Sequence, residues 1–127
     1  MLKAYWIIRS GTLNFPIART ENSIIERCVS DVGQIAITHY EVLKEFKNYS
    51  LVKCNLKTGR THQIRVHFSH INHPLLGDSL YNLNQDVNKL INRQALHSYK
   101  MEFIHPVKQN VLSLEAQLFQ DMKNLII

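Results

Sequence analysis

The 127-residue sequence is poor in cysteine, proline and glycine, with two, three and four residues of each. The two cysteines, Cys28 and Cys54, lie far apart and form no CxxC pair, which excludes a zinc knuckle and a disulfide framework. No segment approaches the roughly 18 uncharged apolar residues that a membrane span needs, and the apolar start is too short for a signal peptide. We therefore expect a soluble, cytoplasmic protein.

Internal repeats, low-complexity tracts and linkers rich in proline, glycine or serine are also absent from the sequence. Because a chain of this length can bury enough surface for one core, we expect residues 1–127 to form a single domain. Fifteen Lys and Arg residues against ten Asp and Glu leave a formal charge of +5. This balance modestly favours an anionic partner such as nucleic acid.

The hydrophobic pattern predicts strands joined by hairpins, together with a few short helices. Helices are expected from an N-cap at Thr61 to Ile71, more weakly over 84–91, and over 119–127. Together these elements predict an α+β fold built around a mixed or antiparallel sheet. The expected strands cover residues 3–9, 34–43, 48–56, 96–104 and 111–118. The residues expected to share one face of the first helix are Ile64, His67, Phe68 and Ile71.

The stretch 56–67 carries the clearest chemical signal. A turn at Gly59 leads into a helix start, where backbone N–H groups gather beside Arg60 and His62 and favour an anion such as phosphate. Arg65 lies one turn beyond Thr61, so its guanidinium can face the same concavity and hold a carboxylate or a phosphate. Spacing alone favours the simpler alternative, in which both arginines are solvated surface side chains.

Residues 58–67, TGRTHQIRVH, resemble the signature of the RluA-type family of RNA pseudouridine synthases. Shorter motifs of that family occur in the family's order, so the resemblance covers nearly the whole chain. These motifs are KxY at 3–5, GxLxxPI at 11–17, AxTxY at 36–40, PLxGDxxY at 74–81, RQxLH at 93–97 and FxHP at 103–106.

The resemblance implies an isomerase that converts uridine to pseudouridine in ribosomal or transfer RNA, without a metal or a diffusible cofactor. In this family the essential group is an aspartate in an HRLD motif upstream of KxY. By the same resemblance, Arg65 would pair with that aspartate and lower its pKa, and Tyr5 would stack on the extruded uracil and assist removal of the C5 proton. The residues that the resemblance assigns to the pocket wall or to RNA phosphate are Ile64, Arg60, His62 and Lys3.

The sequence departs from the family at the point that matters most for chemistry, because it contains no HRLD motif. The family-like part begins at Lys3, just after the place where that motif belongs. Asp78 lies in a Gly-Asp-x-x-Tyr turn, where its ordinary role is to cap its own backbone, and no other acid matches a catalytic position. We therefore expect the C-terminal part of a synthase catalytic domain, inactive alone. The alternatives are a non-catalytic RNA-binding module and one half of a split enzyme.

Two further features have a simple structural interpretation. No cysteine or carboxylate completes a familiar metal-ligand spacing with the histidines at 62, 67, 70 and 73, so we expect no metal site. Cys54 lies in a strand pattern and is expected to be a small core residue rather than a nucleophile.

Overall fold

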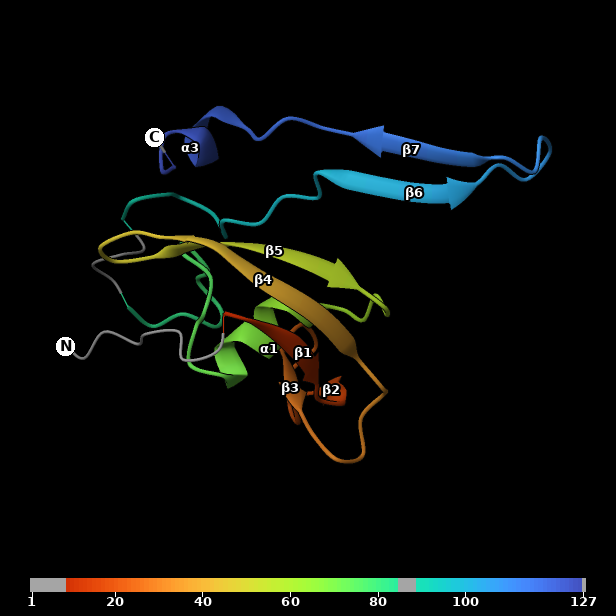
Figure 1. The fold of residues 1–127 in the computed structure, drawn as a ribbon. Coiled ribbons are helices and arrows are strands. Elements are labelled where there is room, and N and C mark those ends of the chain that lie inside the picture. Colours follow the sequence, from red (N-terminus) through yellow and green to blue (C-terminus); the bar gives the residue numbers. More distant parts are fainter. Residues whose placement is uncertain (1–8, 85–88, 127) are drawn as a thin grey trace.

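The computed structural model describes residues 9–84 and 89–126 (Figure 1). The strand predicted over 3–9 lies outside these residues except for Arg9, which is not in a strand, and the candidate site residues Lys3 and Tyr5 also lie outside them. The described helices are α1 (Gln63–His70) and α3 (Gln120–Lys123). The described strands are β1 (Ser10–Asn14), β2 (Ile17–Arg19), β3 (Arg27–Val29), β4 (Ile37–Glu45), β5 (Ser50–Leu56), β6 (Lys100–Ile104) and β7 (Val111–Glu115).

The strands pair antiparallel throughout the described part of the chain, which confirms the predicted α+β class with antiparallel strands. They form one three-stranded sheet in the order β1-β4-β5 and two ribbons, β2-β3 and β6-β7. The predicted hairpin of β4 and β5 is confirmed. Figure 1 shows α1 beside the β2-β3 ribbon and the sheet, while the β6-β7 ribbon extends along the other side. No helix of the described residues is long and apolar enough to span a membrane.

Several predicted boundaries are wrong, and tertiary contacts explain two of them. The strand expected from residue 96 begins only at Lys100, because the Ala95 N–H bonds the Leu76 carbonyl and directs the chain along that loop. The helix expected over 119–127 is limited to Gln120–Lys123, and the Leu125 carbonyl beyond it accepts the Tyr49 hydroxyl instead. Residues 89–91, at the end of the weaker predicted helix, are not helical. Strands β1, β2 and β3 were not predicted, since segments this short show little periodicity.

The start of α1 also differs from the prediction, because Thr61 does not cap it. His62 is the N-cap residue, in the left-handed conformation with a φ of 55°, and it makes no side-chain cap bond. The Gln63 side chain organises this turn instead. Its Oε1 accepts the Thr58 hydroxyl at 2.7 Å and the Arg60 N–H at 2.9 Å. A buried amide therefore fixes the turn that precedes α1, while the N-cap residue itself makes no side-chain cap bond.

The buried face of α1 is rotated from the predicted one, since Ile64 and Ile71 are only half-buried. Val66 packs with Ile17 of β2 and Ala36, just before β4, to form the buried apolar cluster, and Val29 and Tyr81 pack against it. This cluster fixes α1 against the β2-β3 ribbon. The buried residues of α1 are Gln63, Val66, His67 and Phe68.

A chain of hydrogen bonds between neutral groups joins α1 to β4 inside the fold. Gln63 Nε2 donates to the Thr38 hydroxyl at 2.9 Å, and Thr38 Oγ1 lies 2.9 Å from His67 Nδ1. His67 Nε2 lies 2.8 Å from the Phe15 carbonyl oxygen, which can only accept. His67 therefore carries its proton on Nε2 and accepts the Thr38 hydroxyl proton at Nδ1. Burial lowers the pKa of His67, which favours this neutral form.

Candidate active site around Arg65

Arg65 extends from α1 to a buried carboxylate in the loop that follows the helix. Its Nε donates to Asp78 Oδ2 and its Nη2 to Asp78 Oδ1, each at 2.8 Å. The Asp78 side chain is fully buried, and that of Arg65 is 13% exposed. A two-point pair of this kind fixes both the position and the plane of the guanidinium. Arg65 is therefore a preorganised cation and not the solvated surface side chain that spacing alone favoured.

Asp78 accepts four hydrogen bonds, three of them at Oδ1. Besides the two bonds from Arg65, its Oδ1 accepts the Leu80 N–H at 3.0 Å and the Tyr81 N–H at 3.2 Å. Burial raises the pKa of the Asp78 carboxyl, but the hydrogen bonds from Arg65, Leu80 and Tyr81 and the charge on Arg65 outweigh it, so the pKa lies below its ordinary value. The predicted turn-capping role of Asp78 is confirmed. A carboxylate held in this way is poorly suited to attack a substrate.

Tyr81 connects Arg65 to His62. The Arg65 guanidinium lies 5.1 Å from the centre of the Tyr81 ring, within the range of a cation–π contact. The Tyr81 oxygen accepts the Arg27 N–H at 2.9 Å and lies 2.8 Å from His62 Nδ1. Burial, with the positive charges of Arg65 and Arg27, lowers the pKa of His62, which favours the neutral imidazole.

Arg60 precedes α1 and is directed at a separate depression. Its Nε donates to the Ile35 carbonyl at 2.8 Å, and the side chain lines a depression that also contains Thr61 and two other arginines. Ile64 is half-buried on α1. The structure thus brings Arg65 and His62 together around Tyr81 and places Arg60 at a neighbouring depression.

The sequence motifs do not reveal which residues hold this arrangement together. Asp78 and Tyr81 belong to a motif that the sequence displays, but nothing along the chain indicates that they contact Arg65 and His62. Within TGRTHQIRVH, Gln63 and His67 are buried and serve the interior network, while Arg65 is the member directed at the 74–81 loop. The motif is therefore in large part a structural element that presents one fixed cation.

The chemistry open to the site follows from the groups left over. Arg65 Nη1 bonds no residue among those that the structure describes, so it can donate to a second anionic group. Burial raises the pKa of the Cys54 thiol to about 11, which leaves it protonated near neutral pH and unsuited to nucleophilic attack. Within the described ranges, no three His, Cys, Asp or Glu side chains gather closely enough to hold a metal ion.

Comparison with known proteins supplies the family. A sequence profile described as RNA pseudouridylate synthase matches residues 1–70, more than half of the chain. An uncharacterized RNA pseudouridine synthase of Bacillus subtilis, YhcT, is 46% identical over 119 residues, which cover 92% of this chain and 38% of the relative. Ribosomal large subunit pseudouridine synthase D of Haemophilus influenzae is 36% identical over 129 residues, covering 93% of this chain and 40% of the relative.

The fold has solved counterparts as well. The structure of human RNA Pseudouridylate Synthase Domain Containing 1 superposes with a TM-score of 0.76 at 21% identity, covering 98% of this chain and 60% of that one. This chain spans about two fifths of the length of the Bacillus and Haemophilus relatives. The profile match, the identities and the shared fold lead to one conclusion: the chain belongs to the RNA pseudouridylate synthase family.

Proposed function

We propose that this chain forms the C-terminal part of the catalytic domain of an RNA pseudouridine synthase, which isomerises uridine to pseudouridine in ribosomal or transfer RNA. The observation that carries the proposal is the fixed pair between Arg65 of the family signature and Asp78 of the 74–81 motif, with a guanidinium edge still available. Several of its relatives are named for the ribosomal large subunit, which supports RNA as the substrate and the cytoplasm as the location.

The reaction requires no net change in composition. The N1–C1′ bond breaks, the base turns, and C5 bonds to C1′ while the C5 proton leaves and N1 gains a proton. An ionised carboxylate must meet the sugar or the base in a pocket that excludes water. In the proposed mechanism, Nη1 of Arg65 holds that carboxylate charged and aimed at the extruded nucleotide. No step uses a metal or a diffusible cofactor.

The remaining candidate residues have assigned roles in the same proposal. Tyr5 stacks on the uracil and assists loss of the C5 proton. Ile64 forms part of the pocket wall, and Asp78 positions Arg65 without touching substrate. The residues proposed to hold RNA phosphate are Arg60, His62 and Lys3.

A second candidate function is a non-catalytic RNA-binding module, and one observation favours it. The carboxylate that pairs with Arg65 is that of Asp78. The four hydrogen bonds that it accepts leave it unsuited to attack a substrate. The HRLD aspartate does not occur in the sequence. We therefore expect the 127-residue chain by itself to bind RNA without isomerising uridine, and the aspartate to come from another segment or a separate polypeptide.

Release of tritium from RNA labelled at uridine C5 tests the proposal. The 127-residue chain is assayed alone and after mixing with the part of the Haemophilus relative that this chain does not cover. We expect no release from either piece alone and release from the mixture, abolished by Arg65→Met in this chain. RNA binding without release from the mixture would favour the non-catalytic module. Absence of both RNA binding and release would overturn the proposal.

A further inference from the structure

A shallow depression beside the Arg65 site collects three arginines from separate parts of the chain. Arg19 ends β2, Arg27 begins β3, and Arg60 precedes α1. The backbone at Gly33 and the exposed Gln34 and Thr61 complete the polar part of its wall. No aspartate or glutamate lines this depression. A concave surface of this composition concentrates positive potential.

The three guanidinium groups keep their full charge. None of them takes part in an ion pair with any described residue. Arg60 is held through Nε by the Ile35 carbonyl at 2.8 Å. Arg27 Nη1 lies between 3.1 and 3.3 Å from the carbonyl oxygens of residues 24, 25 and 26. Carbonyl oxygens orient a guanidinium without neutralising it, so both groups are preorganised for an anion.

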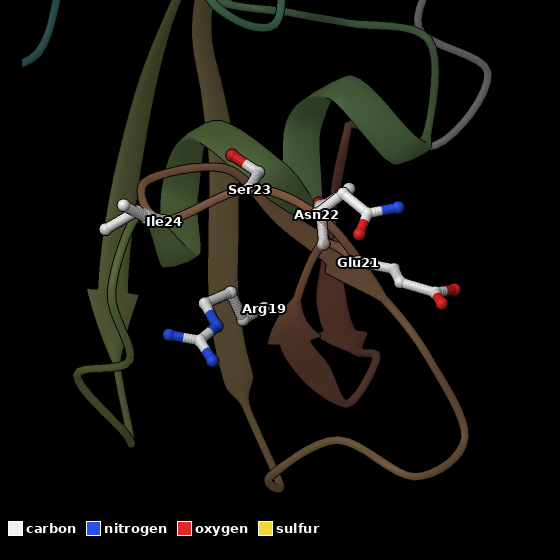
Figure 2. Close-up of a pocket in the computed structure, with 6 residues that line it drawn as sticks. Arg19, Glu21, Asn22, Ser23 and Ile24 are labelled. Carbon is white, nitrogen blue, oxygen red and sulfur yellow. The ribbon is translucent and has the colours of Figure 1, made fainter.

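Arg19 is equally unopposed. Figure 2 shows its guanidinium and the Glu21 carboxylate pointing to opposite sides of the loop that joins β2 to β3. That loop is closed by its own backbone, since the Thr20 N–H bonds the Glu26 carbonyl at 2.9 Å and the Ser23 N–H bonds the Thr20 carbonyl at 3.1 Å. The closed loop therefore holds Glu21, the acidic residue labelled in Figure 2, away from Arg19.

We propose that the depression of Arg19, Arg27 and Arg60 binds phosphates of the RNA backbone and extends the RNA-contacting surface beyond the Arg65 site. The inference rests on the proposed function and deepens it, because it assigns phosphate binding to two arginines that no motif marks. The two places adjoin at Tyr81, whose oxygen accepts the Arg27 N–H at 2.9 Å and whose ring centre lies 5.1 Å from the Arg65 guanidinium.

Salt-dependent binding of a fluorescein-labelled single-stranded RNA to the 127-residue chain tests the site. Each lost phosphate contact makes the negative slope of log affinity against log salt concentration less steep by about 0.7. It also weakens binding about 5-fold at roughly 0.1 M salt. We expect these changes for Arg19→Gln. For Arg19→Gln combined with Arg60→Gln we expect about twice the change in slope and about 25-fold weaker binding. Arg60→Lys keeps the charge and should retain most of the affinity.

The matched control is Lys53→Gln combined with Lys108→Gln, which removes two exposed charges that do not line the depression. Thermal unfolding of every variant verifies that the fold persists, and Arg27 is left intact because it holds the loop carbonyls. If the arginine pair weakens binding no more than the lysine pair while the unmodified chain binds RNA, the site is wrong and the proposed function stands. If the unmodified chain binds no RNA, the site is wrong, and tritium release from the mixture then decides whether the proposed function stands.

Discussion

Arg65 and Asp78 show how one pair of charges defines a site at the scale of single residues. Taking two charges out of water is costly, and the cost is offset here by two short hydrogen bonds between them and two backbone donors to the carboxylate. The result is a cation whose plane is fixed before any substrate arrives. A solvated arginine would have to lose side-chain entropy on binding, and Arg65 has already lost it.

Asp78→Asn is expected to destabilise the protein by about 3 kcal/mol, because it leaves the Arg65 charge buried without its counterion. The asparagine Oδ1 can still accept the backbone N–H groups of Leu80 and Tyr81, so the turn itself persists. Urea unfolding measures the loss. Asp31→Asn, at an exposed position, is the control and should change stability by no more than about 0.5 kcal/mol. Equal effects of the two changes would contradict a buried pair.

Two glycines provide a matched test of close packing. A Cβ at Gly33 would lie 2.5 Å from the carbonyl carbon and 2.8 Å from the nitrogen of Ile17, whereas a Cβ at Gly59 meets nothing within 4 Å. We expect Gly33→Ala to cost about 2 kcal/mol, because the backbones of β2 and the 33–34 segment must separate. Gly59→Ala should leave thermal stability nearly unchanged, although Gly59 lies in the family signature. The reverse order of effects would contradict this packing.

At the scale of elements, α1 is positioned by polar groups as much as by apolar ones. Its apolar contact with β2 and the start of β4 is small, while Gln63 and His67 reach into the interior and meet Thr38. Each member of this network has its partners, which is the condition for a buried polar network to stabilise a fold. The network depends on a neutral His67, so α1 is sensitive to protonation.

Stability is expected to fall as the pH drops below about 6.5, the ordinary pKa of histidine. In the folded protein, burial lowers the pKa of His67, so below 6.5 the unfolded chain binds a proton that the folded chain does not. His62 and His73 shift in the same direction. Asp78, whose pKa is also lowered, adds a further loss below its ordinary 3.8. The unfolding midpoint in urea, measured from pH 7.5 to 5, checks the first of these losses.

His67→Gln separates the contribution of the network from that of the other histidines. Glutamine donates and accepts as neutral imidazole does but does not titrate. The variant should therefore lose less stability than the unmodified chain between pH 7.5 and 5. An unchanged pH dependence would show that His67 does not govern it.

At the scale of the whole molecule, the β6-β7 ribbon stands out because one of its faces is apolar and largely exposed. Met101 pairs with Leu114 and Phe103 with Leu112 across the ribbon, and three of these four side chains are exposed. The other face carries Lys100 and Glu102, paired at 3.1 Å. A two-stranded ribbon gains little stability alone, and an open apolar face favours association.

We expect the isolated chain to bind a hydrophobic dye and to self-associate as its concentration rises. Leu114→Lys, on the apolar face, should reduce dye fluorescence and shift the chain toward the monomer in light scattering. Ser113→Lys adds the same charge on the opposite face and should leave both nearly unchanged. If the two variants behave alike, the apolar face does not drive association.

The antiparallel class, the β4-β5 hairpin and the presence of α1 follow from local patterns, and the structure confirms them. Local patterns do not predict the short strands β1 to β3, the N-cap of α1, or the limits of β6 and α3. Contacts from distant segments decide these features. Arg65 as the important cation remains a prediction from the motif, and Lys3 and Tyr5 lie outside the described residues.

The sequence by itself determined the family and the identity of the signature, because motif order is written along the chain and needs no folding to be read. Only the tertiary structure decided that Asp78 meets Arg65, that Tyr81 joins Arg65 to His62, and that three arginines share one depression. Each of these contacts joins segments whose approach depends on how α1 packs against the β2-β3 ribbon. Packing of that kind is a property of the whole fold and leaves no local signal in the residues that it brings together.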